Sequence, residues 1–256
     1  MSERDSYPAG VPCWVETLQR DRHAAQQFYA SLFGWQIVAS EEDAYAVARL
    51  RDRDVAGIGV LTDPSLPEAW YTNVSVEKLD DAVRTAQAAG ATVLHAAIEA
   101  EPAGRLAVIS DPQGAVLCLW EAECREGAQV INEPGAWAMS ALQTADVDAA
   151  LAFYGSVFGW QAEAFGPATL LRLPGFVGGT PTQPVPRDVV AVAIPDASGP
   201  PRWGVDFWVA DTDATAARAV ELGGSVIQGP FDRPPFRSAV LADGAGASFS
   251  ISQLRA

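Results

Sequence analysis

Two segments of this chain, 125 residues apart, carry the same ordered set of aromatic residues and glycine. The pattern Phe-Tyr-x3-Phe-Gly-Trp occupies residues 28–35 and returns at residues 153–160, and an aspartate stands seven positions before each copy, at Asp21 and Asp146. Chance would hardly supply so many matches in order, and the spacing is close to half of the 256 residues. We therefore interpret the chain as a tandem duplication of one module.

The later part of each copy repeats more loosely and at a larger spacing. Residues 89–94 match residues 222–227 at an offset of 133, and the turn sequence at 111–114 matches 243–246 at an offset of 132. The change in offset implies about eight extra residues in the second copy. We expect them in the proline-rich stretch at 181–201.

Within each module, short strands alternate with two helices. In the first module, residues 12–18 are apolar and typical of a strand, and residues 22–33 have the apolar spacing of a helix. Asp21 is suited to cap the start of that helix, and Gly34 is suited to end it. A second helix is expected at 80–89, before the closing strands of the module.

This pattern resembles the vicinal oxygen chelate superfamily, which includes glyoxalase I, bleomycin-resistance proteins, fosfomycin-resistance enzymes and extradiol dioxygenases. The resemblance rests on the Phe-Tyr-x3-Phe-Gly-Trp helix and on the Asp-Pro-Gln-Gly turn, and it is strongest to two-module glyoxalase-like proteins of actinomycetes. It implies an α+β fold in which tandem βαβββ-type modules form curled mixed sheets around cavities. We expect a first glyoxalase-like module at 8–122, a linker at 123–134 and a second glyoxalase-like module at 135–254.

Metal-dependent members of this superfamily place their ligands on the inward faces of the strands. The resemblance assigns to these positions Trp14, Tyr71 and Cys118 in the first module and Met139, Gly204 and Ser250 in the second. Divalent ions need several converging oxygen or nitrogen ligands, which these residues do not supply. The only two histidines, His23 and His95, are expected on a helix and at a strand end, away from these positions. We therefore predict no metal and no cofactor, although a metal enzyme with ligands elsewhere remains an alternative.

Strand alternation predicts which side chains accompany these positions on the inward faces. The candidate ligand-binding residues are Trp14, Tyr71, Asn73, Cys118 and Trp120 in the first module and Met139, Gln143, Trp208 and Ser250 in the second. Aromatic rings of this kind stack on flat ligands. Glu16 and Asp206 are candidate catalytic residues, because a carboxyl group that faces an apolar cavity has a raised pKa. The alternative is that the aromatic residues only fill the core and that the acids are solvated or paired with arginine.

Composition excludes several classes of partner. The net charge of −15 is wrong for a nucleic-acid backbone, and no apolar run approaches the length of about 20 residues that a membrane span needs. The three cysteines, Cys13, Cys118 and Cys124, lack CxxC spacing, which argues against a disulfide framework or a zinc site. We expect the protein in the reducing cytoplasm.

Two functions remain open at this stage. The first is a metal-independent protein that binds a hydrophobic or aromatic small molecule, as in natural-product binding or antibiotic resistance. The second is a cofactor-independent enzyme of secondary metabolism, an isomerase, cyclase or lyase, that uses a cavity carboxylate as general acid or base. The two modules already form the pair that single-module relatives build from two copies, so a monomer or a homodimer is expected.

Overall fold

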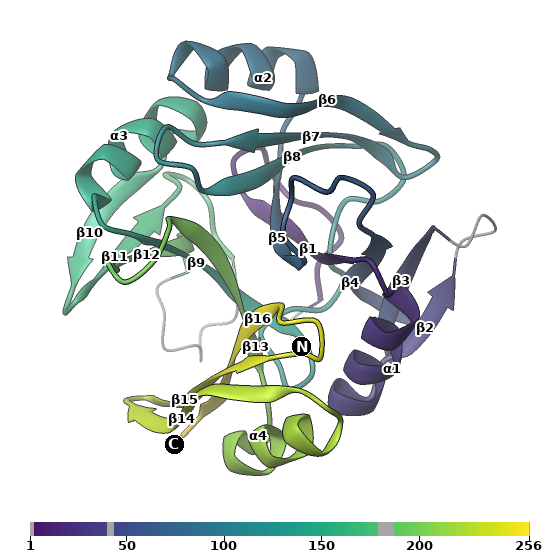
Figure 1. Cartoon of the computed structure of the whole chain (residues 1–256). Coiled ribbons are helices and arrows are strands. Elements are labelled where there is room, and N and C mark those ends of the chain that lie inside the picture. Colours follow the sequence, from purple (N-terminus) through teal and green to yellow (C-terminus); the bar gives the residue numbers. More distant parts are fainter. Residues whose placement is uncertain (1–2, 40–43, 179–186, 256) are drawn as a thin grey trace.

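The computed structural model describes residues 3–39, 44–178 and 187–255, which fold into two modules of the same design (Figure 1). The first module contains β1 (Pro12–Gln19), α1 (Arg22–Phe33), β2 (Gln36–Ala39), β3 (Tyr45–Leu50), β4 (Arg53–Val60), β5 (Ala69–Ser75), α2 (Leu79–Ala88), β6 (Thr92–Ala100), β7 (Gly104–Ser110) and β8 (Val116–Ala122). The second contains β9 (Trp137–Thr144), α3 (Val147–Phe158), β10 (Gln161–Phe165), β11 (Ala168–Arg172), β12 (Val189–Pro195), β13 (Arg202–Trp208), α4 (Thr212–Glu221), β14 (Ser225–Arg233), β15 (Phe236–Ala242) and β16 (Ser248–Leu254). Among the described residues, no helix is long and apolar enough to cross a bilayer.

Each module has one eight-stranded sheet, and the strand order is the same in both. The orders are β2-β3-β4-β1-β5-β8-β7-β6 and β10-β11-β12-β9-β13-β16-β15-β14. The pairs β1–β4 and β5–β8 run parallel, as do their counterparts β9–β12 and β13–β16, whereas β1–β5 and β9–β13 are antiparallel. Each module therefore consists of two βαβββ units joined side by side. The α+β fold of tandem modules with mixed sheets is confirmed.

The two sheets lie back to back and curl away from each other. Their central strands meet where Thr72 Oγ1 of β5 lies 2.7 Å from Ser140 Oγ of β9. In Figure 1 the concave side of the first sheet opens to the right and that of the second opens to the left. The two concave faces therefore lie on opposite sides of the molecule, and each is lined by one module.

The tyrosine of each repeated motif reaches into the other module. Tyr29 Oη donates a hydrogen bond to Asp243 Oδ2 at 2.7 Å, and Tyr154 Oη donates to Asp111 Oδ2 at 2.9 Å. The other carboxylate oxygen of each aspartate accepts two backbone N–H groups of its own turn. The tyrosine of the Phe-Tyr motif and the turn aspartate thus form one contact between the modules, and the repeat provides this contact twice.

The tryptophan that ends each motif makes a second contact between the modules. Trp35 Nε1 donates to the carbonyl oxygen of Gly135 at 2.7 Å, and Trp160 Nε1 donates to that of Gly10 at 2.7 Å. Gly34 directs the chain toward this contact, because it ends α1 in the left-handed conformation, with φ of 73°. The repeated residues therefore stabilise the association of the two modules.

The extra residues of the second module lie earlier than the sequence suggests. Strand β12 falls inside the stretch at 181–201 and pairs with β9, as β4 pairs with β1. Only residues 51–52 separate β3 from β4, whereas residues 173–188 separate β11 from β12. The expectation for 181–201 is wrong from Val189 onward, and residues 179–186 lie outside the described part of the chain.

Candidate functional site

Strand pairing gathers the candidate residues into two groups, one on the concave face of each sheet. In the first module, Glu16 of β1 lies opposite Tyr71 of β5. In the second, Asp206 of β13 lies between Met139 of β9 and Ser250 of β16. The two groups occupy corresponding places in the repeat, but their surroundings differ.

The concave face of the first module is filled by its own side chains. Glu16 is 7% exposed, and both of its carboxylate oxygens accept hydrogen bonds. Oε1 accepts from Asn73 Nδ2 at 3.0 Å, and Oε2 accepts from Tyr45 Oη at 2.7 Å. The Tyr45 hydroxyl in turn accepts from Trp14 Nε1 at 2.9 Å. Each carboxylate oxygen of Glu16 therefore already has a partner within the protein.

Tyr45 fills the first concave face, and two glycines of β4 make room for its ring. A Cβ atom on Gly57 would overlap the Tyr45 hydroxyl, and one on Gly59 would lie 2.9 Å from Tyr45 Cδ2 and 2.8 Å from Leu18 Cδ2. Tyr45 was not a candidate from the sequence. The signal that could have identified it is the alternation of glycine in β4, since such glycines mark a close approach by another group.

Cys118 packs beneath this network with Tyr71 and Val108. Burial raises the pKa of the Cys118 thiol well above its ordinary value, and the nearby Glu16 carboxylate raises it further. A thiol in such surroundings stays protonated and is a poor nucleophile. Burial also raises the pKa of Glu16, although hydrogen bonds from Asn73 and Tyr45 oppose that shift.

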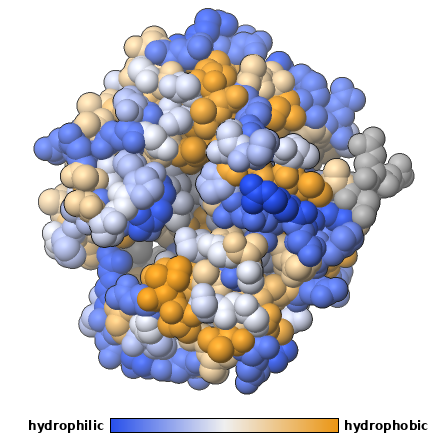
Figure 2. Space-filling model, in the orientation of Figure 1, coloured by the Kyte–Doolittle hydropathy of each residue, from blue (hydrophilic) through white to orange (hydrophobic). Residues whose placement is uncertain are grey.

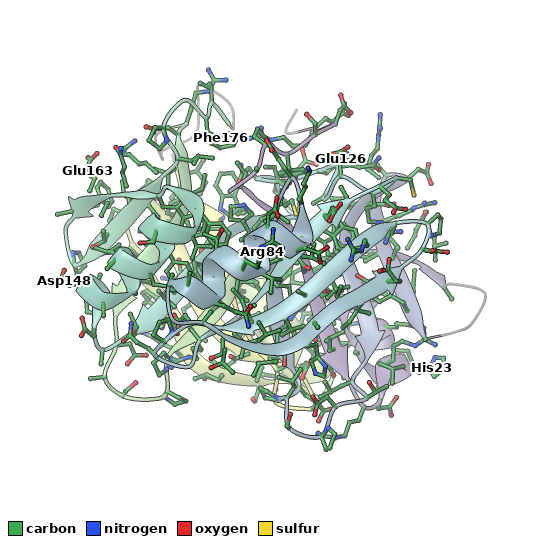
Figure 3. The ribbon with its side chains drawn as sticks, turned by 90° about the horizontal axis from the view of Figure 1, so that it is seen from above. His23, Arg84, Glu126, Asp148, Glu163 and Phe176 are labelled. Carbon is green, nitrogen blue, oxygen red and sulfur yellow. The ribbon has the colours of Figure 1, made fainter. Side chains whose placement is uncertain are left out.

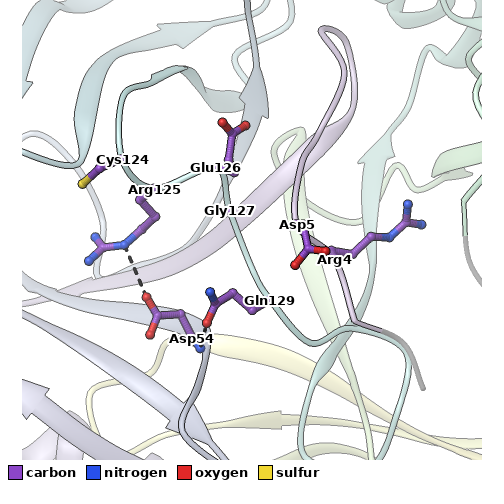
Figure 4. A pocket seen from close by; sticks show the side chains of 8 residues that line it. All are labelled: Arg4, Asp5, Asp54, Cys124, Arg125, Glu126, Gly127 and Gln129. Atoms are coloured by element: carbon purple, nitrogen blue, oxygen red, sulfur yellow. Dashed lines mark hydrogen bonds and ion pairs between the residues drawn. The ribbon is translucent and has the colours of Figure 1, made fainter.

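The linker covers the outer side of the first concave face. The Arg125 guanidinium lies 5.6 Å from the centre of the Trp14 ring, and Trp120 Nε1 donates to the carbonyl oxygen of Arg125 at 2.9 Å. Beside this contact is a polar pocket of about 320 Å³ (Figure 4). Its lining residues are Arg4, Asp5, Asp54, Cys124, Arg125, Glu126, Gly127 and Gln129. Arg125 also lies 3.7 Å from Asp54. Contacts with Trp14 and with Asp54 therefore both hold this part of the linker over the first concave face.

The concave face of the second module is open by comparison. Along β13, Gly204, Asp206 and Trp208 are partly exposed, whereas the residues between them are buried. Smaller side chains replace the large ones of the first module: Met139 for Trp14, Gly204 for Tyr71, Ser252 for Trp120, and Ala168 at the start of β11 for Tyr45 at the start of β3. Figure 2 shows hydrophobic residues on the lower left part of the molecule, where the second sheet lies.

Asp206 is the acid of this open face. Its Oδ1 accepts a hydrogen bond from Ser252 Oγ at 2.8 Å, and Ser252 Oγ lies 2.9 Å from Ser238 Oγ. Burial raises the pKa of Asp206 from 3.8 to about 7, against the lowering effects of the Ser252 hydrogen bond and of Arg233. A carboxyl group with such a pKa exchanges its proton near neutral pH.

The remaining candidate residues of the second module flank Asp206. The rings of Trp208 and Phe236 lie 5.8 Å apart between centres and form an aromatic wall. Gln143 Oε1 accepts a hydrogen bond from Arg202, which also forms an ion pair with Asp196 at 2.8 Å. The open face therefore combines an acid, an aromatic wall and neutral polar groups.

Among the residues that the structure describes, neither concave face brings together the several donors that a divalent metal ion needs. On the first, the oxygens of Glu16 are occupied by Asn73 and Tyr45. Within the described residues, no three His, Cys, Asp or Glu side chains gather as a metal site. His23, on α1, lies at the outer edge of the molecule (Figure 3). His95, on β6, has its Nε2 atom 2.6 Å from Asp63 Oδ2.

Comparison with known proteins places this architecture in a family. A family model described as a glyoxalase-like domain matches residues 15–120 and 139–252. The Mycobacterium tuberculosis protein CFP32, which carries a provisional glyoxylase name, is 36% identical over 98% of this chain and 97% of its own length. The anthracycline biosynthesis protein DnrV of Streptomyces peucetius is 32% identical over 97% of this chain and 95% of its own.

Solved structures share the fold at much lower sequence identity. The Mn(II)-bound glyoxalase of Novosphingobium aromaticivorans superimposes with a TM-score of 0.66 at 14% identity, over 96% of this chain and 82% of its own. The 2,3-dioxygenase LapB of Pseudomonas sp. KL28 gives a TM-score of 0.63 at 12% identity, over 97% and 94%. These likenesses concern the fold alone. The family match and the two relatives together show that this chain belongs to the glyoxalase-like family, with one such domain in each module.

Proposed function

We propose that this protein binds a hydrophobic or aromatic small molecule on the concave face of the second module, without a metal ion. The observation that carries the proposal is the contrast between the two faces. Tyr45 and Trp14 fill the first, whereas Asp206 and Trp208 on the second are partly exposed. Aromatic side chains with a few polar groups are typical of sites for flat ligands. The name of the relative DnrV supports an aromatic natural product as ligand.

Metal independence is part of this proposal and is supported by the donor chemistry. The faces carry tryptophan, methionine, serine and amide groups where a divalent ion would need converging oxygens or nitrogens. The three cysteines are free thiols, which supports a role in the reducing cytoplasm. Elemental analysis of protein purified without chelator should find no stoichiometric metal, and ligand affinity should be the same after dialysis against chelator.

Calorimetric titration against a panel of aromatic natural products tests the binding function. We expect one ligand per chain, recovered chemically unchanged after release. Trp208→Ala should weaken binding at least about ten-fold, because it removes one ring of the aromatic wall. Val220→Ala, on the exposed side of α4, is the matched control and should bind like the wild type. Recovery of a converted product would contradict a purely binding role.

The alternative is a cofactor-independent enzyme with Asp206 as general acid or base. The specific observation in its favour is the pKa of Asp206, which burial raises to about 7. If this holds, Asp206→Asn should abolish conversion of a bound compound while its affinity changes little. Full activity of that variant would reject the assignment. Glu16 is not part of this alternative, because Asn73 and Tyr45 occupy its oxygens.

A further inference from the structure

Asp206 differs from Glu16 in having an oxygen that the protein leaves unused. Ser252 donates to Oδ1 of Asp206. Among the described residues, Oδ2 of Asp206 has no hydrogen-bond partner, and no basic side chain lies at ion-pair distance from this carboxylate. Asp206 is only partly buried, and Oδ2 is not among the buried polar atoms that lack a partner, so this oxygen faces solvent and a ligand donor can reach it.

The charged groups around this face do not supply the missing partner. Arg202 is held by Asp196 in an ion pair of 2.8 Å. Arg237 of β15 is held by Asp213 and Asp232 on the outer side of the sheet. Arg233, at the end of β14, influences Asp206 only from a distance. The net charge of −15 on the whole chain favours the approach of cations over anions to the molecule.

Apolar groups flank the unused oxygen. Met139 lies directly opposite Asp206 on β9, and Trp208 follows two positions along β13 with its ring against Phe236. A flat apolar body placed on this wall would bring a substituent beside the carboxylate. Aromatic rings also attract a cation that lies over them, so the wall and the carboxylate favour the same charge.

We propose that the ligand of the second concave face is an aromatic or apolar molecule that carries a protonated amine, with the ammonium group against Asp206 Oδ2. This inference rests on the proposed binding function and specifies the class of ligand. The amine donates to Oδ2 and balances the carboxylate, while the apolar body packs on Trp208, Phe236 and Met139. An anionic or neutral analogue of the same shape leaves the carboxylate unpaired, so it binds more weakly.

Two probes with the same ring system test the inference on the full chain. Aminomethylanthracene is a cation at about pH 8, and hydroxymethylanthracene is neutral there. By fluorescence titration, the wild-type chain should bind the amine at least about ten-fold more tightly than the alcohol, as expected for one added charged hydrogen bond. Asp206→Asn should remove this preference, and Asp206→Glu should retain part of it.

Asp148→Asn is the matched control, because it removes one carboxylate from the exposed face of α3, at the edge of the molecule in Figure 3. It should keep the preference for the amine. Raising the salt concentration should weaken binding of the amine and not of the alcohol, a measurement that needs no variant. Equal affinities for the two probes, unaffected by salt, would overturn the amine inference alone. Absence of binding by either probe would overturn the proposed binding function as well.

Discussion

Asp206 is an acid whose ionisation destabilises the folded protein. Because burial raises its pKa from 3.8 to about 7, the folded chain holds this proton more tightly than the unfolded chain does. The protonated Asp206 carboxyl group therefore favours the folded state. This contribution to the free energy of unfolding is fully present below about pH 4 and is lost as the pH rises through about 7. We expect Asp206→Asn to raise the free energy of unfolding by about 1–2 kcal/mol at about pH 8, and by less than half of that at about pH 5.

Urea unfolding of the two chains at both pH values measures this difference. Asp148→Asn, on the exposed face of α3, should show no comparable dependence on pH. A gain from Asp206→Asn that is equal at the two pH values would contradict the assigned cause, which is the burial of the charged carboxylate.

Glu16 is expected to matter for stability and not for ligand binding. Glu16→Ala removes the acceptor of Asn73 Nδ2 and of Tyr45 Oη and leaves one buried donor and one partly buried donor unpaired. We expect a loss of about 3 kcal/mol in the free energy of unfolding, measured by urea titration. At temperatures where the variant stays folded, its affinity for ligands of the second module should equal that of the wild type. A selective loss of affinity would instead place Glu16 in the binding site.

The positions of both acids could be inferred from the sequence, but their different surroundings could not. Alternation along a strand is a local property, so it places Glu16 on the face of Trp14 and Asp206 on the face of Gly204, and the resemblance to the superfamily then indicates that this face is the inward one. Whether a carboxylate oxygen is free depends on residues distant in sequence. Tyr45 is 29 positions from Glu16 and reaches it only because β3 pairs with β4. The proposed roles of these acids therefore stay predictions.

At the scale of elements, the glycines of β4 keep the first concave face closed. Gly57→Ala would place a Cβ atom within the space of the Tyr45 hydroxyl, which must then move away from Glu16. We expect the free energy of unfolding to fall by about 2–3 kcal/mol in urea titrations. Gly229→Ala in β14 is the control, since a Cβ atom there meets nothing within 4 Å. An equal change in the free energy of unfolding for the two substitutions would show that the effect comes from backbone entropy alone, and not from the contact with Tyr45.

Elements with local signals could be predicted, and those without them could not. Helix α1 begins after Asp21, whose side chain accepts from the backbone N–H of Ala24, and ends at Gly34, as the sequence predicts. Both signals lie within the helix itself. The place of the inserted residues is predicted only in part, because the proline-rich stretch at 181–201 overlaps the connection at 173–188 but also contains strand β12. Strand β12 is nevertheless identified by the apolar run from Val189 to Ile194 and by its pairing with β9.

At the scale of the whole molecule, the sequence repeat predicts two modules. It does not predict which contacts the repeated residues make. In the sequence, the Phe-Tyr-x3-Phe-Gly-Trp motif lies in the expected helix at 22–33 and just after it, with no sign of a partner elsewhere in the chain. Its Tyr29 instead bonds to Asp243 of the other module, and its Trp35 bonds to Gly135. A sequence repeat cannot distinguish contacts within a copy from contacts between copies, because both are duplicated together. The tertiary arrangement was therefore needed to assign the motif to the interface.

The two tyrosine contacts between the modules have the same geometry, but the two aspartates accept different numbers of side-chain hydrogen bonds. Tyr154 is the sole hydrogen-bond donor to Asp111 Oδ2 among the described residues, whereas Asp243 Oδ2 accepts from both Tyr29 and Gln19. Removal of the Tyr154 hydroxyl thus leaves a buried carboxylate oxygen unpaired. Removal of either tyrosine hydroxyl also leaves a tryptophan donor without its acceptor, Trp203 Nε1 at Tyr154 and Trp70 Nε1 at Tyr29, so the difference between the two sites lies in Gln19.

We therefore expect Tyr154→Phe to lower the free energy of unfolding by about 2 kcal/mol and Tyr29→Phe by about half as much, since Gln19 still donates to Asp243. Each variant serves as the matched control of the other.

Because these contacts join the modules, tryptophan fluorescence and far-ultraviolet circular dichroism should report one common transition in urea. Two separate transitions in the wild type would mean that the modules unfold independently, and the tyrosine contacts would then stabilise neither.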